Sequence, residues 1–272
     1  MKVTLRKILR KLLDHWGYNH FSYVSWWRTW AFNLRYFDLK TALKRPVFIY
    51  NDTDVFWIGK VVLDAKNIYK GMIRIGYWPM KAHNRTRIAK GGTIIFHGSL
   101  DIWGGAIIEG GGTLEFGDNV MLGESSKIMN EERMVFEDHI RVGYDCTFMD
   151  TDYHYIIDTQ THKAHRNKGE VVIGEGTWIS STCKIMKGTR LPKNSIVGGG
   201  SLVNHDFSAE EPCQIFVGTP AKPVKSNQRR IFNVKVEDEL NKYFKEHPEE
   251  KSHIVEVDDI DELCYSNFFR NR

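Results

Sequence analysis

The sequence predicts a mainly β protein whose central part is a solenoid of short parallel strands. Apolar residues recur every six positions, and small residues follow many of them at a fixed offset of four. An α-helix with 3.6 residues per turn cannot produce a six-residue spacing, whereas strands that each point one apolar side chain inward can. The recurring apolar positions are Phe96, Ile102 and Ile108; Phe116, Leu122 and Ile128; Phe136, Val142 and Phe148; and Ile173, Ile179, Ile185, Leu191, Val197 and Val203.

Three such strands make one three-sided coil of eighteen residues. The first three triplets start twenty residues apart, which is eighteen plus two extra residues at a corner. The gap from Phe136 to Ile173 is then a coil that carries a long inserted loop after His154. We expect five coils between residues 96 and about 208. A β-sandwich is the alternative, but it would not need a strict six-residue pattern.

The extent of the six-residue pattern divides the chain into three predicted regions. Residues 1–90 form an N-terminal region of helices and short strands, 91–217 the β-helix with its inserted loop 155–170, and 218–272 a C-terminal extension. Residues 2–16 predict a basic amphipathic helix, with Leu5, Ile8, Leu12 and Trp16 on its apolar stripe. Such a helix either docks on its own domain or a sister subunit, or associates weakly with an anionic membrane.

Composition narrows the class of protein. The net charge of +4 over 272 residues does not call for nucleic acid. The four cysteines show neither disulfide nor zinc-ligand spacing, and no apolar run approaches the roughly 20 residues that a bilayer span needs. We therefore expect a soluble protein of the reducing cytoplasm, with the inner face of the membrane as an alternative position.

Beyond the six-residue pattern, the chain contains six further motifs: GMIRIG (71–76), LEFGDNVMLGE (114–124), FMDTDYH (148–154), VVIGEGTWIS (171–180), VGGGSLVNHDF (197–207) and VGTPAKPVK (217–225). In this order they resemble the motifs of the hexapeptide-repeat acyltransferases. The resemblance covers roughly residues 70 to 225, and it implies a left-handed parallel β-helix that assembles as a homotrimer. The N-terminal segments TWAFNLRYF (29–37) and RPVFIY (45–50) further resemble the leader of the branch that acetylates capsular and lipopolysaccharide sugars.

The candidate catalytic residues form a D-x-D-x-H run, Asp150, Asp152 and His154. Moving an acetyl group from a thioester to a hydroxyl needs a base for the hydroxyl proton and a donor for the oxyanion. His154 is the expected general base, as the resemblance also implies, and Asp150 or Asp152 would orient its ring. The run also suits a metal ion, but its residues are all local and this chemistry needs none, so we expect no metal.

The resemblance also implies the residues that hold acetyl-CoA between neighbouring β-helices. The backbone N–H of Ser181 would donate to the oxyanion, and the pantetheine arm would pass beside it. The residues implied along the arm are Trp178, Ser180, Gly199 and Ser201, and those implied for the cofactor's phosphates are Lys222 and Lys225.

We therefore expect an acetyl-CoA-dependent O-acetyltransferase that acts on a sugar hydroxyl of a cell-surface polysaccharide or its precursor. The resemblance implies direct transfer in a ternary complex, and no cysteine or serine has a base beside it in the sequence to form an acyl-enzyme. One alternative is acetylation of a small molecule such as an amino sugar, serine or an antibiotic. A non-catalytic trimeric scaffold is the alternative from another class, but a scaffold would have no reason to keep both His154 and the cofactor-side motifs.

Overall fold

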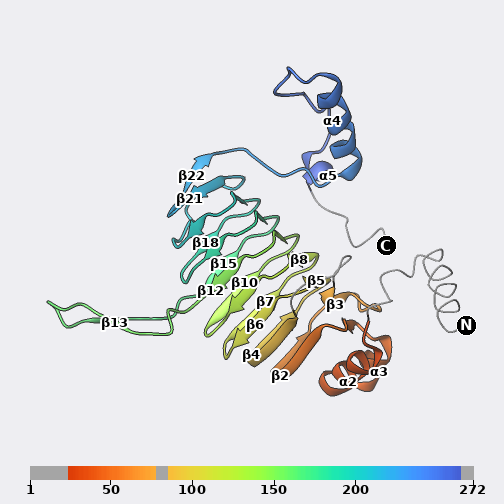
Figure 1. Cartoon of the computed structure of the whole chain (residues 1–272), viewed down its shortest axis with the longest axis vertical. Coiled ribbons are helices and arrows are strands. Elements are labelled where there is room, and N and C mark those ends of the chain that lie inside the picture. The colour runs from red at the N-terminus through yellow and green to blue at the C-terminus, as the bar shows by residue number, and fades with distance from the viewer. Residues whose placement is uncertain (1–23, 78–84, 265–272) are drawn as a thin grey trace, which may run out of the picture.

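The residues of the six-residue pattern lie on short strands that stack in register from one coil to the next (Figure 1). The computed structural model of the chain describes residues 24–77 and 85–264. The basic helix expected at residues 2–16 lies outside the described residues. Within a coil the chain runs over a first, a second and a third face, and the strands of each face pair in parallel with those of the coils before and after.

The first face holds the longest column of strands. Its last strand, β21, also pairs with the antiparallel β22 (Ala221–Lys225). Its strands are β1 (Val47–Ile49), β3 (Ile73–Tyr77), β5 (Leu100–Trp103), β8 (Val120–Leu122), β11 (Arg141–Val142), β16 (Trp178–Ile179), β19 (Ile196–Val197) and β21 (Ile215–Gly218).

The second and third faces form one continuous sheet because β4 bends around the corner between them. The beginning of β4 pairs with β6 and its end with β7. At the bend, a Cβ on Gly92 would come within 1.9 Å of the carbonyl oxygen of Gly112, so the coils approach too closely there for a side chain. Strands β2 (Thr53–Leu63) and β4 (Thr86–Phe96) pair along their whole length and span both faces. The second face continues with β6 (Ile107–Gly110), β9 (Lys127–Met129), β12 (Thr147–Met149), β17 (Lys184–Ile185) and β20 (Leu202–Val203); the third continues with β7 (Thr113–Phe116), β10 (Arg133–Phe136), β15 (Val171–Ile173) and β18 (Arg190–Leu191).

The core runs along the axis of the coils. The rings of Phe96, Phe116 and Phe136 stack at 6.2 Å and 5.3 Å between centroids, and Phe148 meets Phe136 edge-on at 5.0 Å. Parallel register sets one such side chain above the next, so a buried ladder forms. The small residues at the offset of four are buried as well, namely Thr177, Cys183, Thr189, Ser195 and Ser201.

The predicted fold class is confirmed: the chain is mainly β, a parallel β-helix with a helical segment before and after it. The parallel stacking begins at Val47, where β1 pairs with β3, and so includes part of the segment 1–90. No helix among the described residues is long and apolar enough to span a membrane.

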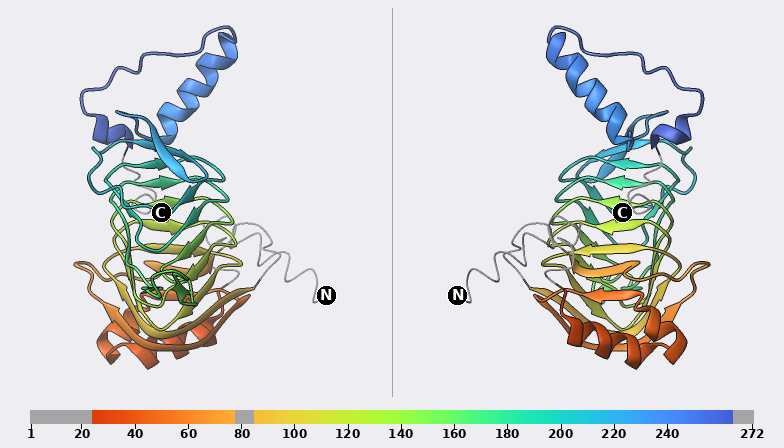
Figure 2. Two further views of the ribbon diagram at one scale, coloured as in Figure 1. Left: turned by 90° about the vertical axis from the view of Figure 1, so that its left-hand side faces the viewer. Right: turned by 90° about the vertical axis from the view of Figure 1, so that its right-hand side faces the viewer.

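Two helices close the N-terminal end of the coils (Figure 2). They are α2 (Trp26–Tyr36) and α3 (Leu39–Lys44). Asn33 of α2 fastens this end to β1, because its amide group donates to the carbonyl oxygen of Val47 at 2.7 Å and accepts from its N–H at 3.2 Å. At the opposite end lie α4 (Val234–Glu246) and α5 (Ile260–Cys264) (Figure 1).

The inserted loop is a hairpin. β13 (Ile156–Ile157) and β14 (Ala164–His165) pair antiparallel, and the hairpin projects from the side of the coils (Figure 1). An isolated antiparallel bridge between Thr151 and Lys168 closes its base. The sequence marked this segment only as a polar insertion.

Candidate active site

His154 lies in the turn just before β13, where the chain leaves the corner between the second and third faces and enters the hairpin. Its backbone N–H donates to the carbonyl oxygen of Asp152 at 2.7 Å, around Tyr153, whose φ is +61°. This tight turn leaves the His154 side chain exposed. Within residues 24–77 and 85–264, its imidazole has no hydrogen bond or ion pair, so it is available to a ligand or to a second copy of the chain.

Asp150 stabilises the coil rather than orienting His154. Its carboxylate is fully buried and accepts hydrogen bonds from Asn130 Nδ2 at 2.6 Å and from the backbone N–H groups of Glu131 and Glu132 at 2.7 and 3.0 Å. All three donors lie at the same corner in the preceding coil. The Asp150 carboxylate therefore ties that corner to the base of the hairpin. None of its hydrogen bonds to described residues is with His154.

This position leads to a prediction for Asp150→Asn. The amide would present a donor where the carboxylate accepts from three N–H groups, and buried donors without an acceptor are costly. We expect the free energy of unfolding to fall by about 2 kcal/mol, measured by urea denaturation. An unchanged unfolding midpoint would show that the three hydrogen bonds do not hold this corner.

Lys187, in the following coil, clamps both ends of the hairpin. Its Nζ lies 2.5 Å from Asp152 Oδ2 at the entry and 2.9 Å from the carbonyl oxygen of Arg166 at the exit. Asp152, the other carboxylate expected to orient His154, is thus paired with a lysine instead. This lysine was not predicted, because it lies more than thirty residues after Asp152 in the sequence.

We expect Lys187→Met to loosen the hairpin while leaving the coils intact, because the contact is half-exposed and such ion pairs contribute at most about 1 kcal/mol. Trypsin should then cut at Lys163 and Arg166 several-fold faster. Lys184→Met is the matched control, since Lys184 is exposed on the same face and makes no ion pair among the described residues. Equal cleavage of both variants would argue against the clamp.

A buried lysine lies in the same column of corners. Lys90 is fully buried and donates to the carbonyl oxygens of Gly110, at 3.2 Å, and Gly112. Burial lowers the pKa of Lys90 to about 8, against a smaller opposing effect of the Asp150 carboxylate. Together with Asn130 and Asp150, Lys90 makes this corner a polar column below the hairpin, which the sequence did not predict.

Ser181 lies at a different corner, between the first and second faces. The residue after it, Thr182, has a φ of +62° and donates its N–H to Tyr144 in the preceding coil at 2.9 Å. The N–H of Ser181 itself has no acceptor in the part of the chain that the structure describes. In the next coil Gly199 occupies the equivalent position, where a Cβ would lie 3.6 Å from Ser180 Oγ. The corner therefore offers an unpaired amide among small side chains.

The other residues expected on the cofactor side have separate environments. Trp178 of β16 is half-buried, and the guanidinium of Arg230 from the C-terminal extension lies 4.6 Å from its ring centre. Ser201 is buried, and its Oγ accepts from the N–H of Gly218 at 3.1 Å. Lys222 and Lys225 are exposed on β22. Only Ser180, Ser181 and Gly199 are thus brought together at one corner.

The two halves of the candidate site are at opposite edges of the second face. Strand β17 separates the Ser181 corner from the corner of Lys187, which holds the hairpin of His154. A strand rises about 3.3 Å per residue, and five residues intervene between Ser181 and Lys187. One chain therefore does not bring the imidazole and the Ser181 amide together.

The chain is thus a parallel β-helix whose candidate site is divided between two corners. Two curated proteins match parts of its sequence. A chloramphenicol acetyltransferase of Klebsiella aerogenes is 37% identical over 62 residues, which are 23% of this chain and 28% of that protein. A Staphylococcus aureus (strain MRSA252) protein named as an acetyltransferase is 29% identical over 89 residues, 30% of this chain and 43% of that protein. The chain thus spans less than half the length of either relative. No family model matches the sequence.

Solved structures cover a larger share of the chain than these two proteins, at lower sequence identity. The polysialic acid-specific acetyltransferase NeuO covers 74% of this chain and 99% of its own length, at 19% identity and a TM-score of 0.43. The Bacillus cereus N-acyltransferase AntD, with coenzyme A and a dTDP-amino sugar, covers 73% of this chain and 88% of its own length, at 14% identity and a TM-score of 0.41. Overlaps of this size do not define the fold, which rests on this chain's own strand pairings.

Proposed function

We propose that the protein is an acetyl-CoA-dependent O-acetyltransferase that acts on a sugar hydroxyl of a cell-surface polysaccharide or its precursor. The observation that carries the proposal is that one chain presents both an exposed histidine at an inserted hairpin and, at a separate corner of small residues, a backbone amide without an acceptor among the described residues. Both relatives matched in sequence carry acetyltransferase names. The polysaccharide acceptor rests on the resemblance of the leader segments 29–37 and 45–50.

The reaction would proceed by direct transfer. His154 takes the proton of the acceptor hydroxyl as the oxygen attacks the thioester carbonyl, and the Ser181 N–H donates to the oxyanion. When the tetrahedral intermediate collapses, the C–S bond breaks and the imidazolium returns its proton to the leaving thiolate. An acyl-enzyme is not needed, and Cys146 and Cys183, the cysteines nearest the Ser181 corner in the strand register, are fully buried.

A second copy of the chain would complete the site. The two corners lie at opposite edges of one face, so His154 of one copy and Ser181 of another would face the same acetyl group. A closed trimer of β-helices would repeat this arrangement three times. Gly199 and Ser180 would leave room for the pantetheine arm, and Lys222 and Lys225 would reach the phosphates. The four unpaired cysteines fit a reducing compartment, so we place the protein in the cytoplasm.

A small-molecule acceptor is the second candidate, favoured by the sequence match to a chloramphenicol acetyltransferase. Both candidates predict acetyl-CoA-dependent release of free thiol, and the acceptor distinguishes them. The test is a thiol-release assay with acetyl-CoA and two panels, one of capsular and lipopolysaccharide oligosaccharides and one of amino sugars, serine and chloramphenicol. Turnover with the second panel alone would replace the polysaccharide proposal, and failure to bind acetyl-CoA would remove both. Light scattering that reports a monomer would contradict the shared site.

A further inference from the structure

Helices α2 and α3 lie at the N-terminal end of the coils (Figure 2), and the outer side of both helices is apolar. The inner side of α2 is buried against the first coil through Thr29, Phe32 and Asn33. The outer side carries large side chains that are mostly exposed: Trp27 is 70% exposed, and three leucines lie between 53% and 66%. We call these four apolar residues and the three neighbouring cations the cap surface: Trp27, Leu34, Arg35, Leu39, Lys40, Leu43 and Lys44.

The cations of the cap surface are not neutralised by any residue within 24–77 and 85–264. Arg35, Lys40 and Lys44 make no ion pair with any residue that the structure describes. Asp38 is the one acidic residue between residues 24 and 45, and its carboxylate caps α3 by accepting from the N–H of Thr41 at 3.1 Å. Asp54, on β2, pairs with Arg28 and Arg85 instead. The surface therefore combines exposed hydrocarbon with uncompensated positive charge.

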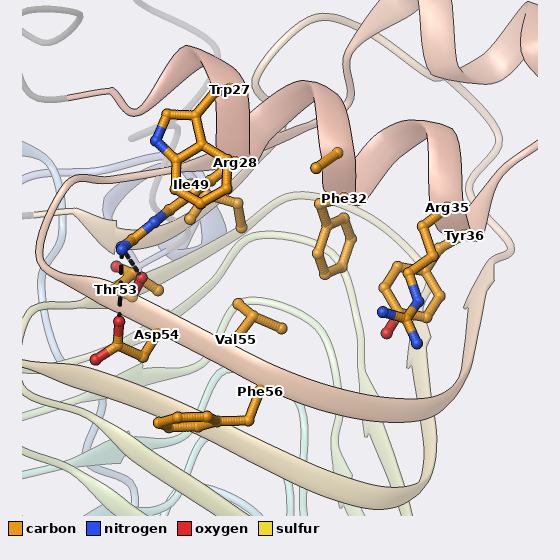
Figure 3. A pocket seen from close by; sticks show the side chains of 11 residues that line it. Trp27, Arg28, Phe32, Arg35, Tyr36, Ile49, Thr53, Asp54, Val55 and Phe56 are labelled. Carbon is orange, nitrogen blue, oxygen red and sulfur yellow. Dashed lines mark hydrogen bonds and ion pairs between the residues drawn. The ribbon is translucent and has the colours of Figure 1, made fainter.

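A cleft extends the cap surface toward the second face, where the beginning of β2 pairs with β4 (Figure 3). It has a volume of about 290 Å³, and Trp27, Arg28 and Arg35 line it from α2. Phe56 of β2 lines its other side and is 61% exposed. Next to it along the strand, Trp57 is 54% exposed. Aromatic and cationic side chains thus continue from the helices onto the adjoining strand.

Positive charge is concentrated at this end of the sequence as well. The first 45 residues contain ten Lys and Arg against two Asp and Glu, a net charge of +8. Residues 46–272 contain 28 against 32, a net charge of −4. A modest total charge therefore conceals a strong asymmetry, which is typical of chains that bind an anionic surface with one end.

We propose that the cap surface binds the surface of an anionic lipid bilayer. Trp and Leu side chains would enter the interfacial region while Lys and Arg contact lipid phosphates, as in amphipathic helices that lie on membranes. Each basic residue near such a surface strengthens binding roughly five-fold. The three cations of the cap surface would together strengthen it roughly a hundred-fold.

Charge and side-chain type favour a bilayer over the other occupants. A symmetric contact between two cap surfaces would place the same uncompensated cations against each other. Nucleic acid would match the charge, but Leu34, Leu39 and Leu43 have no flat ring on which a base could stack. The proposal does not depend on acetyl transfer, so each can fail without the other.

The test is co-sedimentation of the 272-residue chain with vesicles of phosphatidylcholine alone or mixed with phosphatidylglycerol. Two cap variants are compared with the unmodified chain. One reverses charge, Arg35→Glu with Lys40→Glu and Lys44→Glu, and the other removes hydrocarbon, Leu34→Ser with Leu39→Ser and Leu43→Ser. The matched control reverses three exposed lysines of α4 at the far end, Lys235→Glu, Lys242→Glu and Lys245→Glu.

We expect the unmodified chain to bind the mixed vesicles only. Charge reversal should lower that binding at least a hundred-fold, the leucine-to-serine variant should weaken it clearly, and the α4 control should leave it unchanged. Unaltered binding of both cap variants would assign any membrane attachment to other residues and overturn the proposal. Equal binding to both vesicle types would overturn it too. So would binding to duplex DNA without binding to vesicles, or a soluble oligomer that the Leu variants dissociate in the absence of vesicle binding.

Discussion

His154→Ala is expected to lower the rate of acetyl transfer by about 10²- to 10⁴-fold while leaving the affinity for acetyl-CoA unchanged. The proposed step removes a proton from the acceptor hydroxyl, and without the imidazole that proton must go to water. The His154 side chain is exposed and makes no hydrogen bond or ion pair among the described residues, so its loss should not disturb the fold. Thiol release measures the transfer, and calorimetric titration measures the binding.

The matched control is His165→Ala. His165 lies on the opposite strand of the same hairpin, is exposed, and pairs in register with Ile156. The same loss of an imidazole from the same element should therefore leave transfer unchanged. If His154→Ala transferred acetyl as fast as His165→Ala, His154 would have no part in the mechanism. If His154→Ala lost acetyl-CoA binding, His154 would belong to the cofactor site instead.

The coil was predictable because its signal is local and repeats. Each inward residue, such as Phe116 or Phe136, needs only a strand of its own and the same residue type one coil away. These two residues are twenty positions apart, which is one predicted coil, and in the structure their rings stack at 5.3 Å between centroids. The hairpin was marked as an insertion for the same reason, since it interrupts the repeat.

The partners of the polar residues were harder to predict. Asp150 and Asp152 were expected to serve His154 because they are near it in sequence. In a coil, however, a side chain meets residues one coil away, and Asp150 bonds to Asn130, twenty residues earlier. Reading the polar residues at the coil offset would have found this pair. No periodic signal could have found Arg230 over Trp178, because the C-terminal extension follows no repeat.

Gly199→Leu is expected to weaken acetyl-CoA binding at least a hundred-fold, about 2.7 kcal/mol. Gly199 follows Ser181 by one coil, and the proposed pantetheine arm passes this corner. Its φ is not in the left-handed region, and a Cβ there would meet Ser180 Oγ and the Ser181 carbonyl oxygen at 3.6 Å, an ordinary contact. The coil should therefore accept the leucine, whose side chain would fill the space outside the corner. Calorimetric titration with coenzyme A measures the effect.

Gly111→Leu is the control that makes this result specific. Gly111 is also an exposed corner glycine without a left-handed φ, and a Cβ there would meet only Glu131 Oε2 at 3.6 Å. It lies at the corner between the second and third faces, away from the Ser181 corner, so coenzyme A binding should persist. If both leucines weakened binding equally, the cause would be damage to the coil. If neither did, the thioester would have to bind elsewhere, and the Ser181 amide would lose its role. Loss of binding in Gly199→Leu alone, with binding retained in His154→Ala, would assign cofactor and base to the two separate corners that only a second copy of the chain can bring together.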